Sequence, residues 1–117
     1  MYRISKEFAF SASHQLLNLP EGHKCAGLHG HNYIVVLDLA SPTVDEAGFV
    51  IDVHELKDLK TYIDDVFDHA HLNDVMDVSP STENVAKHFY DWCKARWHQT
   101  VAVRVSETPK IWAEYRP

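Results

Sequence analysis

Three histidines are spaced so that they could share one metal ion. His29 and His31 are separated by one glycine at the start of a predicted strand, and alternate side chains of a strand lie on the same face. His14 ends the preceding predicted strand, so pairing of the two strands would bring it to the other two. Three neutral imidazoles form the open ligand set of a catalytic zinc ion, with a fourth position free for water or substrate. The spacing alone leaves a second interpretation open, in which these histidines are ordinary surface residues.

Cys25 lies four residues before His29, in a turn that contains glycines and Lys24. Such surroundings are compatible with an exposed, partly ionised thiol. The residues leave three roles open for Cys25: a fourth ligand in a closed structural zinc site, a reactive thiol, or an inert loop residue. Cys93 falls on the apolar face of a predicted helix, where we expect a small core residue. Two cysteines make no disulfide framework, and reduced thiols are expected in the cytoplasm.

Further candidates are polar residues that follow or begin predicted elements. Asp68 directly precedes His69, and a neighbouring carboxylate can orient an imidazole and tune its charge. Thr82 and Glu83 begin a predicted helix, where an acidic residue also favours the helix dipole. Glu107 lies between two predicted strands and could be an ordinary turn carboxylate. The residues alone therefore indicate that these groups are candidates, without assigning their roles.

The composition limits the classes of function. The chain has 117 residues, with 11 Lys and Arg against 17 Asp and Glu, which argues against a general nucleic-acid surface. Three Trp, five Tyr and five Phe exclude an intrinsically disordered chain. No stretch approaches the roughly 20 apolar residues of a membrane span, and the first residues do not resemble a secretory signal. We expect one domain over residues 1–117, located in the cytoplasm.

Hydrophobic periodicity predicts the elements that position these groups. The predicted strands cover residues 2–14, 29–40, 101–105 and 111–115, with a further short strand over 49–51. The predicted helices cover 53–67, capped by Asp52, and a segment from Ser81 or Thr82 to about Trp97. The order β-β-α-α-β-β predicts an α+β fold, with a four-stranded antiparallel sheet and two helices on one face. The open edges of so small a sheet favour oligomerisation.

Six short motifs occur in a recognisable order along the chain. They are Phe10-Ser11-Ala12-Ser13-His14, Gly22-His23-Lys24-Cys25, Leu28-His29-Gly30-His31-Asn32-Tyr33, Asp68-His69 with Leu72-Asn73, Ser81-Thr82-Glu83-Asn84-Val85-Ala86, and Glu107-Thr108. Each motif is modest alone, but the ordered set resembles the family of 6-pyruvoyl-tetrahydropterin and 6-carboxy-tetrahydropterin synthases over essentially the whole chain. The resemblance implies the T-fold, or tunnelling fold, whose element order agrees with the one expected above.

The resemblance also implies a role for each candidate residue. Zn²⁺ would be bound by three histidines, His14, His29 and His31. The catalytic acid or base and its relay partners would be Cys25, Asp68 and His69. The pterin ring would be anchored by Glu107, in a pocket lined by Thr82 and Glu83.

The spacing of three residues between Cys25 and His29 resembles the bacterial 6-carboxy-tetrahydropterin synthases of the queuosine (7-deazaguanine) pathway. The implied activity is that of a zinc-dependent carbon–carbon lyase, which converts 7,8-dihydroneopterin triphosphate to 6-carboxy-5,6,7,8-tetrahydropterin, acetaldehyde and triphosphate. The alternatives are a 6-pyruvoyl-tetrahydropterin synthase, a zinc-binding protein without catalysis, and a pterin-binding module that shares only the fold. The resemblance further implies a homohexamer of two stacked trimers, with Asp68 and His69 completing the site of a neighbouring chain. No nucleic-acid or membrane partner is expected.

Overall fold

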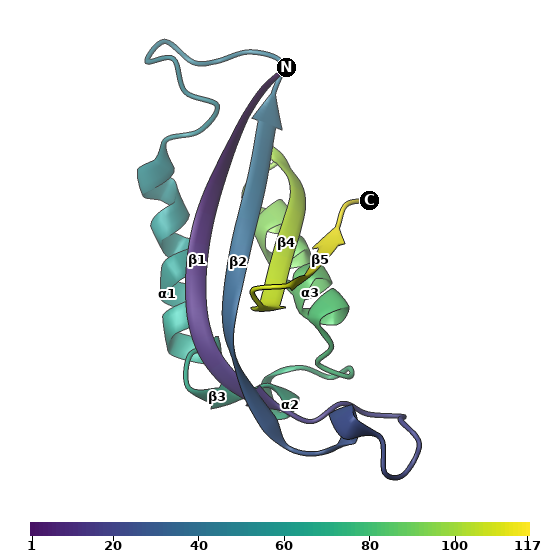
Figure 1. The fold of residues 1–117 in the computed structure, drawn as a ribbon. Coiled ribbons are helices and arrows are strands. Elements are labelled where there is room, and N and C mark those ends of the chain that lie inside the picture. The colour runs from purple at the N-terminus through teal and green to yellow at the C-terminus, as the bar shows by residue number, and fades with distance from the viewer.

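A computed structural model describes all residues, 1–117. Five strands form one mixed sheet in the order β3-β1-β2-β4-β5. Their bounds are Tyr2–His14 for β1, His29–Ser41 for β2, Ala70–His71 for β3, Thr100–Thr108 for β4 and Ile111–Tyr115 for β5. β1 and β2 form a long curved ribbon that extends beyond the other strands (Figure 1).

The first helical segment runs without a break through three geometries. It consists of a 3₁₀ turn η2 (Val53–Leu56), the helix α1 (Lys57–Tyr62) and a π-helical turn η3 (Ile63–Phe67). The Asp52 carboxylate caps it by accepting a hydrogen bond from the backbone N–H of His54. The predicted range of 53–67 is therefore correct, although only the middle part is α-helical.

The second main helix is α3 (Thr82–Arg96), and the hydroxyl of Ser81 caps it by accepting from the N–H of Asn84. Two shorter elements complete the chain: the 3₁₀ turn η1 (Lys24–Ala26) and the helix α2 (Leu72–Val75). In Figure 1, α1 stands beside β1 and α3 lies behind β4 and β5. No helix has the length and apolar character needed to cross a membrane.

One hydrophobic cluster of 22 buried residues fills the space between the sheet and the helices. Alternate side chains of β1 and β2 point into it, as the period of two predicts. Phe10 lies at its centre, stacked on Tyr33 with ring centroids 4.8 Å apart and in edge contact with Phe89 at 6.0 Å. Each such side chain contributes roughly 1.5–3 kcal/mol through burial. Cys93 is fully buried in the cluster, which confirms its predicted core position.

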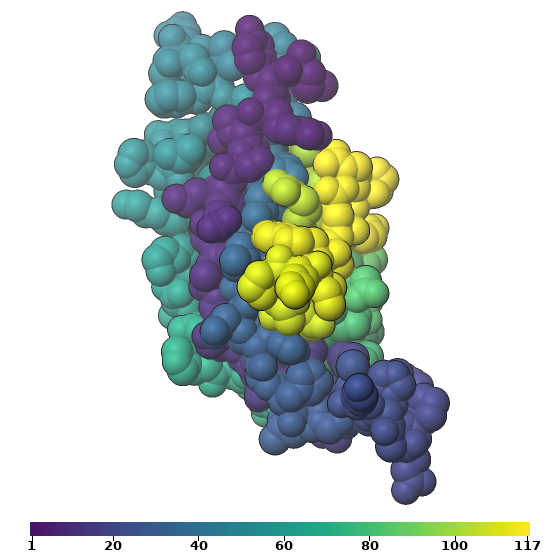
Figure 2. Space-filling model, in the orientation of Figure 1, coloured from purple at the N-terminus to yellow at the C-terminus, as the bar shows by residue number.

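The molecule is elongated along the β1–β2 ribbon, and the connection between these two strands projects from one end. The principal extents are 56 × 26 × 25 Å, and the radius of gyration of 15.3 Å exceeds the value of about 13 Å for a compact domain of this length. Figure 2 shows the segment around residues 15–28, in dark blue, standing away from the body of the molecule. This segment carries Cys25, whose surroundings within one chain are therefore open.

The prediction of a four-stranded antiparallel sheet is wrong in one respect, because a fifth strand makes the sheet mixed. β3 pairs parallel with β1, through Ala12 opposite Ala70 and Ser13 opposite His71. A two-residue strand is too short to produce any hydrophobic period. The pairing is instead supported by the His69 N–H, which donates to the Ser11 carbonyl at 2.6 Å.

The predicted short strand over residues 49–51 is also wrong. A local turn uses the backbone groups that a strand would pair: the Asp45 N–H donates to the Phe49 carbonyl at 3.0 Å, and the Phe49 N–H donates to the Asp45 carboxylate at 2.9 Å. Residues 49–51 therefore belong to a turn and do not add a strand to the sheet.

The face of the sheet away from the helices holds an ion pair between the buried Asp38 and the partly exposed Arg104. Asp38 is 3% exposed and accepts hydrogen bonds from Nε and Nη2 of Arg104 at 3.1 and 3.2 Å, and another from the Ser5 hydroxyl. Burial opposes ionisation of Asp38, but the hydrogen bonds from Arg104 and Ser5 outweigh it and hold its pKa below the ordinary value.

Candidate functional site

His14, His29 and His31 converge at the end of the β1–β2 ribbon. His14 lies directly opposite His29 in the strand register, and His31 follows two residues later on the same face. One ligand nitrogen from each ring lies within 4.8 Å of the others. The predicted grouping of these three histidines on one face is therefore observed.

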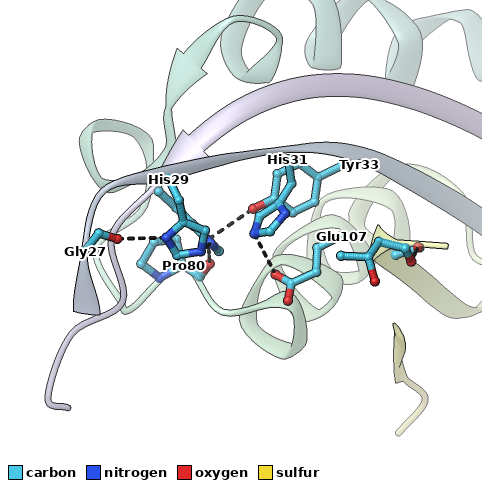
Figure 3. Close-up of polar contacts among 9 residues, drawn as sticks. Gly27, His29, His31, Tyr33, Pro80 and Glu107 are labelled. Carbon is cyan, nitrogen blue, oxygen red and sulfur yellow. Dashed lines mark hydrogen bonds and ion pairs between the residues drawn. The ribbon is translucent and has the colours of Figure 1, made fainter. Parts of the chain in front are cut away.

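Backbone carbonyls fix the proton positions on two of the rings (Figure 3). His14 Nδ1 lies 2.8 Å from the Pro80 carbonyl oxygen, and His29 Nδ1 lies 2.8 Å from that of Gly27. A carbonyl oxygen only accepts, so each Nδ1 must carry the proton. In a neutral ring this leaves a lone pair on Nε2. Histidines that bind a metal through Nε2 have the same tautomer.

The three Nε2 atoms fit a shared cation. Nε2 of His14 and Nε2 of His29 are 2.9 Å apart, a distance at which two lone pairs repel unless a cation lies between them. Nε2 of His31 is buried and has no hydrogen-bond partner. Burial lowers the pKa of His14, and the neighbouring His29 and His31 lower it further, while the bond to Pro80 opposes them. The three histidines are thus positioned to bind a metal ion through neutral imidazoles.

Glu107 lies beside this group, where β4 is irregular. Its Oε2 atom is 3.7 Å from Nε2 of His31, and its side chain is 22% exposed. The register of β4 shifts between Ser106 and Thr108, so the bulge allows Glu107 to reach the edge of the three-histidine group. Glu107 also lines a groove of about 680 Å³ together with His31 and Tyr33. A carboxylate at the wall of a groove can accept hydrogen bonds from a ligand.

Thr82 and Glu83 stand at the start of α3. Thr82 is buried and Glu83 is exposed. They follow Pro80, whose carbonyl accepts the bond from His14, so the start of this helix lies next to the three-histidine group.

Cys25 lies in the short turn η1, and its side chain is half-buried. Its N–H donates to Nδ1 of the His23 side chain at 3.0 Å. The group of converging ligand atoms consists of the three histidines and does not include the Cys25 sulfur. The arrangement therefore favours a three-ligand, open metal site over a closed one with four ligands.

Asp68 and His69 form a dyad at the end of the π-helical turn. Asp68 Oδ2 lies 2.9 Å from His69 Nδ1, and Asp68 Oδ1 accepts from the Ser11 N–H at 3.0 Å. The Ser11 amide and the His69 side chain together lower the pKa of Asp68. His69 has a left-handed backbone (φ 59°), and its side chain is 83% exposed. No hydrogen bond joins the dyad to Cys25 or to the three histidines within one chain.

Several groups around the site were not singled out as candidate site residues from the sequence. The carbonyls of Gly27 and Pro80 act through the backbone, which every residue has. Tyr33 places its buried hydroxyl 3.1 Å from His14 Nδ1. His71, which the sequence left without a role, lies 3.0 Å from the Ser13 hydroxyl and lines a groove of about 590 Å³ with His69.

Known proteins resemble the chain over nearly its full length. A 6-carboxy-5,6,7,8-tetrahydropterin synthase of Bacillus subtilis is 33% identical, covering 99% of this chain and 86% of the relative. The enzyme of the same name from Aquifex aeolicus is 30% identical, covering 98% of each. A third, from Synechocystis, is 40% identical over 74% of this chain and 70% of the relative.

A solved structure of similar fold and a family match also relate the chain to tetrahydropterin synthases. The structure of Caenorhabditis elegans 6-pyruvoyl tetrahydropterin synthase matches with a TM-score of 0.88 and 26% identity, covering 99% of this chain and 95% of that one. The family described as 6-pyruvoyl tetrahydropterin synthase matches residues 3–117. A match of this extent includes the three-histidine group, Cys25 and the dyad, and so the chain belongs to the 6-pyruvoyl tetrahydropterin synthase family.

Proposed function

We propose that the chain is a zinc-dependent 6-carboxy-5,6,7,8-tetrahydropterin synthase, a carbon–carbon lyase of queuosine biosynthesis. It would convert 7,8-dihydroneopterin triphosphate and water to 6-carboxy-5,6,7,8-tetrahydropterin, acetaldehyde and triphosphate. The relatives of that name support the assignment. The observation that carries it is the convergence of three Nε2 atoms beside the turn that holds Cys25.

His14, His29 and His31 would hold the zinc ion, each through Nε2. A zinc ion on three imidazoles supplies Lewis acidity, which makes hydroxyl groups of the substrate side chain easier to deprotonate. The carbonyls of Gly27 and Pro80 would keep two of the ligands in the correct tautomer.

Cys25 would move a proton between the substrate side chain and the ring as the catalytic base and acid. Asp68 would orient His69 through Nδ1, which leaves Nε2 of His69 free to exchange a proton with the thiol. Within one chain the dyad does not reach Cys25. This supports an assembly in which a neighbouring chain supplies Asp68 and His69, and we propose a homohexamer of two stacked trimers.

Glu107 would anchor the pterin ring, because a carboxylate accepts two hydrogen bonds from adjacent N–H groups. Thr82 and Glu83 would line the same pocket from the start of α3. The single hydrophobic cluster supports one domain over residues 1–117. The two free cysteines, Cys25 and Cys93, are consistent with a cytoplasmic enzyme.

The second candidate is a 6-pyruvoyl-tetrahydropterin synthase, which the similarity to the Caenorhabditis elegans structure favours. Mass spectrometry of the products from zinc-loaded protein and dihydroneopterin triphosphate separates the two. We expect 6-carboxytetrahydropterin together with acetaldehyde, trapped as a hydrazone. A 6-pyruvoyl product without acetaldehyde would identify the second candidate. Absence of turnover in protein that retains its metal would indicate a binding protein.

A further inference from the structure

The turn that carries Cys25 is held to the rest of the chain by two side-chain hydrogen bonds. Within the turn, the Ala26 N–H donates to the His23 carbonyl at 3.0 Å, and the His23 N–H donates to the Pro20 carbonyl at 3.1 Å. These local bonds shape the turn but do not anchor it. The two anchoring bonds run from His29 Nδ1 to the Gly27 carbonyl at 2.8 Å and from Gln15 Nε2 to the Ala26 carbonyl at 2.9 Å.

Gln15 is itself fixed in place by Asn73. The Gln15 N–H donates to Asn73 Oδ1 at 2.8 Å, and Asn73 Nδ2 donates to the Gln15 carbonyl at 2.8 Å. The Asn73 amide thus continues the pairing of β1 with β3 by one further step beyond Ser13 and His71. The backbone of Gln15 is rigid for this reason, although its side chain is exposed.

This arrangement links the turn of Cys25 to the three histidines through two consecutive carbonyls. Gln15, which directly follows His14, holds the carbonyl of Ala26, the residue after Cys25. His29 holds the next carbonyl, that of Gly27. An exposed glutamine contributes little to core packing, so its contribution lies in the bond that it donates. A displacement of about 1 Å in a reacting group can lower a rate by about 10²-fold.

We propose that Gln15 is a positioning residue, which sets the place of the Cys25 thiol relative to the three histidines by donating to the Ala26 carbonyl. The inference deepens the proposed function and rests on its assignment of Cys25. The placement of the thiol can nevertheless be measured without any enzymatic turnover.

The test compares Gln15→Met, which keeps the length but loses the donor, with Gln15→Lys, which restores a long donor. The first readout is the rate of alkylation by iodoacetamide. It reports Cys25 alone, because burial raises the pKa of Cys93 to about 12 and hides its sulfur. We expect alkylation about threefold faster or more in Gln15→Met, since the turn opens locally, and near-native in Gln15→Lys.

The second readout is turnover of dihydroneopterin triphosphate. Gln15→Met should lower kcat by roughly 10–100-fold with little change in KM, and Gln15→Lys should recover most of it. Zinc content should equal that of the native protein in both variants. Gln99→Met is the matched control, because Gln99 also donates to a backbone carbonyl, that of Val50 at 3.4 Å, but outside this turn.

Native alkylation and kcat in Gln15→Met would overturn the proposal, as would equal losses in Gln15→Met and Gln15→Lys. If the native protein lacks synthase activity, the proposed function fails, while the alkylation rates still decide the position of the thiol. If Gln15→Met does not fold, Gln15→Asn replaces it, since an amide one methylene shorter cannot span the same distance.

Discussion

Nε2 of His31 lies 3.7 Å from Oε2 of Glu107, which places the carboxylate of one strand against the imidazole of its neighbour. β2 and β4 pair antiparallel from Ile34 opposite Ser106, so both residues lie just beyond the end of one paired segment. A bound ring anchored by Glu107 would therefore present its substituents toward the three histidines at a fixed distance.

Replacing His31 by Ala should abolish stoichiometric zinc binding, because two imidazoles alone leave the tetrahedral site open. Native protein should bind one zinc ion per chain, measured by metal analysis after dialysis. His88→Ala is the control: His88 is a half-buried histidine that instead hydrogen-bonds the Tyr62 hydroxyl at 2.7 Å, and its loss should leave zinc in place. Full zinc occupancy in a His29→Ala, His31→Ala double variant would refute the site.

Cys25→Ala should retain zinc but lose turnover by roughly 10²–10⁴-fold, the usual contribution of a positioned acid or base. Steady-state kinetics together with metal analysis measure both quantities. Cys93→Ala should turn over normally, since that sulfur is fully buried in the hydrophobic cluster. Loss of zinc in Cys25→Ala would point to a fourth ligand instead.

Glu107→Gln should raise KM by about 10-fold or more with zinc unchanged, because one of the two carboxylate oxygens becomes an NH2 donor that cannot accept from the second of two adjacent N–H groups. Glu114→Gln, on β5 and paired with Arg116, is the matched control and should leave KM unchanged. An unaltered KM in Glu107→Gln would show that Glu107 only shapes the bulge.

Asp38→Asn should lower the free energy of unfolding near neutral pH by about 1–3 kcal/mol, since Arg104 loses its charged partner. The pKa of Asp38 is lower in the folded protein than the unfolded value of about 3.9. Its stabilising effect is therefore complete above that value and is lost as the pH falls through the lower, folded pKa. Urea unfolding between pH 3 and 7 measures this. The native protein should lose more stability in acid than Asp38→Asn does, whereas Asp77→Asn, at an exposed position, should follow the native curve.

Mixing Cys25→Ala with His69→Ala, after dissociation and reassembly, should restore part of the activity, because one intact site can form from two chains. Cys25→Ala mixed with His31→Ala should restore none, since both substitutions damage the same chain's share of the site. A fully active monomer by light scattering at assay concentration would contradict the shared site.

The long elements could be predicted because each repeats a period many times. Residues 2–14 alternate over six steps, and the buried side chains of β1 follow that alternation. The two residues of β3 complete no period, and their pairing with β1 is supported by bonds at either end, from the His69 N–H and from the Asn73 side chain. Local turn bonds around Asp45 likewise overrode the apolar run that predicted a strand at 49–51.

The convergence of the three histidines could be predicted because strand geometry converts the spacing of His29 and His31 directly into proximity. The hydrogen bonds that fix the protons on the rings could not be predicted. The carbonyl of Pro80 lies 66 positions from His14, and every residue type has a backbone carbonyl. The proposed link between Cys25 and the dyad could not be derived from residue spacing either, because the two do not meet within one chain and spacing does not encode how chains associate.

The π-helical turn at Ile63–Phe67 determines the direction, around the helix axis, in which the chain leaves the helix. The Asp68 N–H donates to the Ile63 carbonyl at 2.8 Å, five residues back, so this turn contains one residue more than an α-helical turn. Removing one residue would rotate everything that follows by about 100°, and the Asp68 carboxylate would swing away from the Ser11 amide. Substitution of the exposed Asp64 or Asp65 should therefore be tolerated, whereas deletion of either should not. The direction of the dyad depends on the number of residues in the turn and not on their chemistry.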